Sequence, residues 1–143
     1  MIFFISFEEI KMLASKRTGL IMNLEYVDAD KFKVSTFIKL PLIGEKEISL
    51  LLAIESASFG CVQLRNDSGI VSNMILNMLE DIAERILLNT SSTPNELVDI
   101  DINSIKIYPN AIDKVKEIER VLVMHSIVVV DKGFAVNFSC REN

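Results

Sequence analysis

The clearest strand pattern in the chain is KFKVSTFIKL, at residues 31–40. Its even-numbered positions carry apolar side chains or threonine, and its odd-numbered positions carry lysine or serine except at Phe37. Successive side chains of a strand point to opposite faces of a sheet, so this alternation predicts a strand with one buried face. Similar runs lie at residues 20–26, 48–54 and 59–65, separated by short segments rich in turn residues. Because these connections are short, the four strands are predicted to form an antiparallel meander.

The pattern changes to a helical period after Gly69. Apolar residues recur in pairs at every fourth position from residue 70 to residue 87. This spacing predicts one long amphipathic helix of about 20 residues, with Asp67 or Ser68 as its N-cap. Its apolar stripe is expected to lie across the sheet, while its polar side chains face water.

The two ends of the chain carry shorter elements. Residues 7–16 predict a short helix with Ser6 as the N-cap and Glu9 completing a capping box. The preceding residues 2–5 are either a strand or the apolar lead-in to that helix. At the other end, residues 120–130 and 134–140 predict a hairpin around residues 131–133.

The middle of the chain contributes a loop, a strand and a helix. Residues 89–95 have the composition of a loop, with a possible helix start at residues 93–96. Residues 98–107 predict a strand whose pattern changes face, which indicates a bulge or bend near Asn103 and Ser104. Residues 111–119 predict a second short helix.

The expected element order is therefore α-ββββ-α-β-α-ββ. Runs of strands interrupted by single helices are typical of an α+β fold and not of a doubly wound one. We expect an antiparallel sheet packed on the long helix, with curling into a partial barrel or a sandwich left open. A chain of 143 residues matches one domain, spanning 1–143.

Composition restricts where the chain works and what it binds. Hydrophobic residues make up 50% of the chain and charged residues 24%, so the apolar groups must be segregated. The longest apolar runs, residues 1–5 and 50–54, are too short for a transmembrane helix, and the first residues do not resemble a secretory signal. We therefore expect a cytoplasmic protein with no transmembrane segment. The net charge of −5 opposes a nucleic-acid partner.

No motif for nucleophilic, nucleotide or redox chemistry is visible in the sequence. The two cysteines, Cys61 and Cys140, lie in strand-like stretches without a CxxC motif, and we expect reduced, buried thiols. The single histidine, His125, is expected to be a buried or half-buried structural residue. The five glycines are dispersed and form no phosphate-binding loop, so no cofactor and no catalytic residue are assigned.

Clustered carboxylates supply one alternative, a metal-dependent enzyme. Asp99, Asp101 and Asn103 would share one face of a strand, and Glu80 and Glu84 lie on the polar face of the long helix with Asp81. The first cluster departs from a calcium loop, because Ser104 stands where glycine is required and Asn110 where glutamate is required. Solvated strand and helix faces explain both clusters more simply.

The remaining signal is an excess of apolar side chains on strands that need only one buried face. These residues predict a surface for an apolar ligand, a protein partner or a second copy of the chain, with intrachain cover as the plain alternative. Two methionines of the long helix could pack adaptably against such a ligand. The residues of this predicted surface are Leu51, Ala53, Leu122, Met124, Val128, Val130, Met74 and Met78. The first hypothesis is therefore a non-catalytic binding module.

Overall fold

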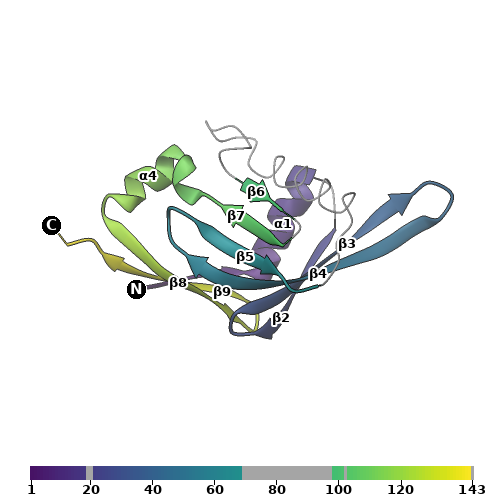
Figure 1. Ribbon diagram of the computed structural model, residues 1–143, viewed down its shortest axis with the longest axis horizontal. Helices are drawn as coiled ribbons and strands as arrows, with labels where there is room; N and C mark the ends of the chain where they lie inside the picture. The colour runs from purple at the N-terminus through teal and green to yellow at the C-terminus, as the bar shows by residue number, and fades with distance from the viewer. Residues whose placement is uncertain (19–20, 69–97, 102, 143) are drawn as a thin grey trace.

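The computed structural model describes residues 1–18, 21–68, 98–101 and 103–142. Within these residues the protein consists of antiparallel strands with two α-helices, which is the α+β class (Figure 1). The first half contains β1 (Ile2–Ser6), α1 (Phe7–Thr18), β2 (Met22–Asp28), β3 (Lys31–Leu40), β4 (Gly44–Ala57) and β5 (Val62–Asn66). The second half contains β6 (Val98–Ile100), β7 (Ser104–Ile107), the 3₁₀ helix η1 (Pro109–Ala111), α4 (Asp113–Glu119), β8 (Leu122–Val130) and β9 (Gly133–Cys140).

The larger sheet contains the predicted meander. Its strand order is β2-β3-β4-β5-β7-β6, and every neighbouring pair is antiparallel. The β3–β4 hairpin extends beyond the rest of this sheet, at the right of Figure 1. At its tip the backbone turns through Leu42, with a φ of 70°, and Gly44, with a φ of 88°. Glycine adopts such angles freely, whereas leucine does so only under strain.

The smaller sheet has the order β1-β9-β8. The β8–β9 hairpin turns through Asp131 and Lys132, as predicted. Residues 2–6 form a strand that pairs with β9, which decides between the two alternatives for this segment. Gly133 lies directly opposite Ser6, where the two backbones approach closely.

Helix α1 begins with the predicted capping box. The Ser6 hydroxyl oxygen accepts a hydrogen bond from the Glu9 backbone N–H at 3.0 Å, and a Glu9 carboxylate oxygen lies 3.4 Å from the Ser6 backbone nitrogen. These two reciprocal bonds satisfy donors that a helix start otherwise leaves without partners. Phe7 and Ala14 of this helix are buried, whereas Leu13 is 46% exposed.

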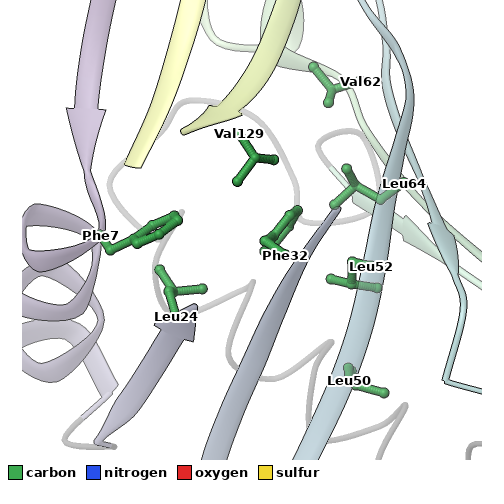
Figure 2. Close-up of a cluster of buried hydrophobic side chains, with 8 residues drawn as sticks. All are labelled: Phe7, Leu24, Phe32, Leu50, Leu52, Val62, Leu64 and Val129. Carbon is green, nitrogen blue, oxygen red and sulfur yellow. The ribbon is translucent and has the colours of Figure 1, made fainter. Parts of the chain in front are cut away.

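One apolar core joins both sheets and α1 (Figure 2). In this core Phe134 of β9 makes edge-to-face ring contacts with Phe7 of α1, at 5.3 Å between centroids, and with Phe32 of β3, at 4.9 Å. Such contacts add to the free energy gained from burial. The buried residues of the cluster are Phe7, Leu24, Phe32, Leu50, Leu52, Val62, Leu64 and Val129.

Three strands contain a one-residue interruption of the pairing register. The extra residues are Val27 in β2, Glu55 in β4 and His125 in β8. A β-bulge of this kind inserts one unpaired residue, bends the strand and changes which residues face the core. In β4, for example, the core side passes from Ile54 to Ala57 instead of Ser56.

Two predictions about the middle of the chain are not confirmed by the structure. The long helix predicted over residues 67–88 and the loop at 89–95 lie outside the described residues, and the described α-helices have only 12 and 7 residues. The single bent strand predicted over 98–107 is instead two strands, since β6 and β7 pair with each other. The chain reverses through residues 101–104, where the Asp101 N–H donates to the Ser104 carbonyl at 2.8 Å.

Candidate functional site

The structure separates the residues of the predicted apolar surface into distinct places. Leu51 and Ala53 lie on the side of β4 that faces away from the core, whereas Leu122 and Met124 occupy the first part of β8. Val128 and Val130 occupy its last part, after the bulge. Met74 and Met78 lie outside the described residues.

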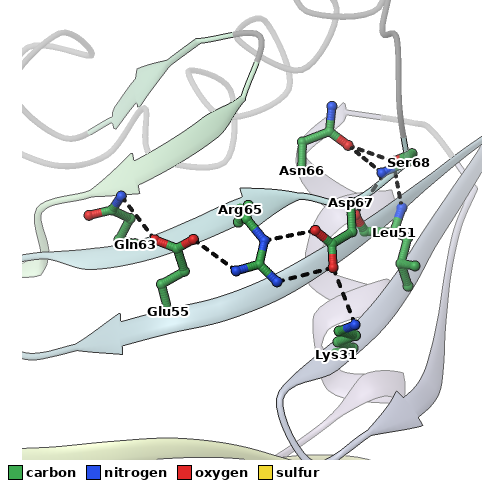
Figure 3. Close-up of polar contacts among 8 residues, drawn as sticks. All are labelled: Lys31, Leu51, Glu55, Gln63, Arg65, Asn66, Asp67 and Ser68. Atoms are coloured by element: carbon green, nitrogen blue, oxygen red, sulfur yellow. Dashed lines mark hydrogen bonds and ion pairs between the residues drawn. The ribbon is translucent and has the colours of Figure 1, made fainter.

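Ala53 is only 1% exposed, and an ion-pair network lies beside it. Lys31 on β3 and Arg65 on β5 flank it directly across the sheet. Asp67 joins these two cations, with its carboxylate 2.7 Å from the Arg65 Nε and 3.3 Å from the Lys31 Nζ. Figure 3 shows this arrangement, which continues from Arg65 to Glu55 at 3.1 Å. Charged groups therefore lie beside a position that the sequence pattern assigned to an apolar surface.

The segment that leaves β5 is fixed by hydrogen bonds to β4. The Leu51 N–H donates to the Ser68 hydroxyl at 2.9 Å, and the Asp67 N–H donates to the Leu51 carbonyl at 2.8 Å. The Ser68 hydroxyl in turn donates to the side-chain oxygen of Asn66 at 2.6 Å. The side chains predicted as N-caps are thus engaged with β3, β4 and β5 (Figure 3), and the helix that they would cap lies outside the described residues.

The network should make stability depend on pH in the acid range. Hydrogen bonds from Arg65, with further support from Lys31, lower the pKa of Asp67 from 3.8 to about 2. A carboxyl group whose pKa is lower in the folded state stabilises the fold above pH 3.8, and this contribution disappears as pH falls towards about 2. We expect the urea midpoint of the wild type to fall across this window more steeply than that of Asp67→Asn.

Asp99→Asn is the matched control for this measurement, because it removes an exposed carboxylate on β6 that forms no ion pair with the described residues. It should keep the steep acid dependence of the wild type. If the urea midpoints of the wild type and of Asp67→Asn fell equally with pH, the network would not contribute to stability.

The first part of β8 faces the core because of the bulge at His125. Met124 packs against the core cluster, as do Ile127 and Val129 after the bulge. A regular strand would place Met124 and Ile127 on opposite faces, and the extra residue brings them to the same face. Leu122 shares the face of Met124, so these two residues belong with the core side of the sheet and not with Val128.

The opposite face of the three-stranded sheet carries exposed and half-buried apolar side chains, with the polar Ser126 and Asn137 among them. Val128 is paired with Ala135, which is paired with Phe4 on β1, so the three side chains form a row across the sheet. Phe4 is 48% exposed and Val128 is 39% exposed. Ile2, at 74% exposure, and Val130 lie on the same face. We call Ile2, Phe4, Val128, Val130 and Ala135 the outer apolar surface.

Strand β1 adds an open backbone edge to this surface. Among the described residues, β1 pairs with β9 alone. Its sequence, IFFIS, contains no charged residue and no proline. Phe3, on the face that points towards the core, is also 57% exposed because it lies at the edge. Sheet edges usually carry charges, prolines or bulges that prevent pairing with another chain, and the described part of β1 has none of these features.

A hollow of about 540 Å³ lies near α4, and its chemistry is different. Its lining residues are Lys116, Glu119, Arg120 and Arg141. The Arg141 Nε donates to the Glu119 carbonyl at 3.0 Å, which ties the end of β9 to the end of α4. A charged lining of this kind does not suit an apolar ligand.

Within the part of the chain that the structure describes, the carboxylates considered for a metal site do not come together. Asp99 lies on β6, whereas Asp101 and Asn103 lie in the reversal after it, so these three do not share one strand face. Within the described ranges, no group of three or more His, Cys, Asp or Glu side chains could hold a metal ion. The helix carboxylates Glu80, Asp81 and Glu84 lie outside those ranges.

The histidine and the cysteines differ from the predicted burial. His125 is exposed at the bulge, and its Nε2 lies 2.5 Å from the Ser139 hydroxyl oxygen. Both cysteines are free, but Cys61 is only half-buried and Cys140 is exposed. The alternating pattern predicted buried side chains at these positions. It could not show that His125 lies at a bulge or that Cys140 is the last residue of its strand.

Searches of protein-family models, of curated proteins and of solved structures found no match for this chain. No described helix is long and apolar enough to cross a membrane.

Proposed function

We propose that this chain is a non-catalytic binding module that binds a protein partner through the outer apolar surface and the β1 edge. The observation that carries the proposal is that both features belong to one strand. Ile2 and Phe4 supply exposed apolar side chains, and the backbone of the same residues lies at an edge with no neighbour among the described strands. A partner that adds a strand there gains main-chain hydrogen bonds and apolar burial together.

A protein partner fits this surface better than a single lipid-like molecule. Ligand sites for small apolar molecules are concave and bury most of the ligand. The outer apolar surface instead lies on an open sheet face, and its row from Phe4 to Val128 spans three strands. An extended strand needs backbone partners that a lipid does not require, and the β1 edge offers them.

A photo-reactive residue tests this proposal directly. A benzophenone amino acid placed at position 4, on β1 itself, should form a covalent adduct with a protein when it is activated in cells, and the same residue at position 43 should not form that adduct. Ile43 is a suitable control because it is 74% exposed but lies at the tip of the β3–β4 hairpin. Mass spectrometry of the adduct identifies the partner. No adduct, or an adduct with lipid alone, would contradict the proposal.

A charge on the surface should weaken this association without unfolding the chain. In Phe4→Lys or Val128→Lys the ammonium group reaches water in the free protein, but it would have to be buried against the partner. We expect affinity for the captured partner to fall at least tenfold, about 1.4 kcal/mol. Ile43→Lys is the control and should bind normally. Affinity by sedimentation, with circular dichroism as the check on folding, distinguishes weakened binding from unfolding.

A further inference from the structure

The backbone of β1 shows which of its groups are available to a partner. Met1 and Phe138 exchange both of their backbone hydrogen bonds, each at 2.8 Å. In an antiparallel ladder such pairs alternate, so Phe3 and Ile5 also direct their N–H and C=O groups towards β9. The N–H and C=O groups of Ile2 and Phe4 therefore point away from the sheet, at the open edge.

The other described sheet edges have features that prevent pairing, and β1 does not. The edge of β8 is bulged at His125, and its Val129 N–H donates to the Ala29 carbonyl in the β2–β3 turn at 2.7 Å. In the larger sheet, edge strand β2 is bulged at Val27 and the opposite edge strand, β6, has only three residues. Bulges and short strands are established means of blocking edge pairing.

The available groups of β1 complement the same groups of an identical strand. If two β1 strands run antiparallel about a two-fold axis at Phe3, Ile2 of each lies opposite Phe4 of the other. Each of these two pairs exchanges two hydrogen bonds, so every outward N–H and C=O group of Ile2 and Phe4 gains a partner. No charge opposes a like charge, because IFFIS carries none.

We propose that the partner of β1 is a second copy of this chain, paired antiparallel about a two-fold axis at Phe3. The proposal rests on the proposed function, since it names the occupant of the β1 edge. The two three-stranded sheets then form one continuous sheet across both copies. Ile2 and Phe4 of one copy lie beside Phe4 and Ile2 of the other on the outer face, so these four side chains cover one another in part, while Val128 and Val130 lie two strands from the junction.

A disulfide at position 3 tests the register. In this arrangement residue 3 faces its own copy as a non-hydrogen-bonded pair, with Cα atoms about 4.5 Å apart, which a disulfide can span. Phe3→Cys, in a chain that also carries Cys61→Ser and Cys140→Ser, should become a covalent dimer under mild oxidation. Ile2→Cys in the same background is the control. Two copies of residue 2 are offset along the strands by two residues, roughly 7 Å, and should cross-link poorly.

Two results would overturn the pairing. They are a Phe3→Cys chain that stays monomeric and equal cross-linking of Phe3→Cys and Ile2→Cys. A position-4 adduct with a different protein, together with no cross-link at position 3, would overturn only this inference and leave the binding module intact. Absence of any protein adduct would remove both proposals.

Discussion

Phe32→Ala is expected to lower the free energy of unfolding by about 3 to 5 kcal/mol. The Phe32 side chain is 6% exposed and lies at the centre of the core, where its ring contacts Phe134 edge to face. Its removal eliminates this contact and leaves a cavity between the two sheets, and β3 and β9 cannot close around it without moving their backbones. Urea denaturation followed by circular dichroism measures the loss.

The same strand provides a matched control for this prediction. Phe37 is five residues further along β3 and is 49% exposed. Phe37→Ala makes the identical chemical change at a site without core packing, and should alter stability by less than about 1 kcal/mol. Similar losses in the two variants would show that Phe32 is not a central residue of the core.

Gly133→Ala is expected to destabilise the protein by about 3 kcal/mol and to loosen β1. A Cβ atom at position 133 would overlap the Ile5 carbonyl oxygen and would lie 2.8 Å from the Ser6 Cα. Backbone atoms cannot move aside as a flexible side chain can, so β1 must shift away from β9. Hydrogen exchange should show faster exchange at the Phe3 and Ile5 amides, which bond to β9.

Gly60→Ala controls for the loss of glycine itself. A Cβ atom there would meet the Ser58 hydroxyl at 3.6 Å, which is an ordinary contact. This variant should keep both its stability and the slow exchange of β1. If Gly133→Ala had the same stability and the same slow exchange of β1 as Gly60→Ala, the β1 and β9 backbones could move apart more easily than the structure indicates.

Local patterns in the sequence were sufficient to predict much of the fold. The alternation in residues 31–40, the short connections and the capping box at Ser6 each depend on neighbours within a few residues, and the structure confirms the meander and α1. The hairpin through Asp131 and Lys132 is confirmed for the same reason. The single domain and the long helix stay predictions.

Errors occurred where a strand changes face or direction. A prediction from the two-residue alternation of a strand assigns every residue to one of two faces. It fails once an unpaired residue is inserted. At His125 this error placed Met124 with Val128. Near Asn103 and Ser104 the pattern predicts a bulge or bend, whereas the chain reverses between β6 and β7.

The outer apolar surface could be predicted only in part. Val128 and Val130 were identified from the apolar excess in β8, but Ile2 and Phe4 were not, because a four-residue apolar run does not show whether it forms a strand. Their place opposite β9 depends on pairing between the two ends of the chain, which local patterns do not reveal. Ala53 shows a second limit, because local patterns did not reveal that the ion pairs of Lys31, Arg65 and Asp67 lie beside it.

The bulges also determine where the chain can change in length. Because His125 is the extra residue in the pairing register of β8 with β9, a chain that lacked it would still carry Met124, Ile127 and Val129 in one alternating series on the core face. Loss of a paired residue such as Val136 would instead transfer every later side chain of β9 to the opposite face. Insertions and deletions of single residues during evolution should therefore be tolerated at Val27, Glu55 and His125, and removed by selection from the regular stretches between them.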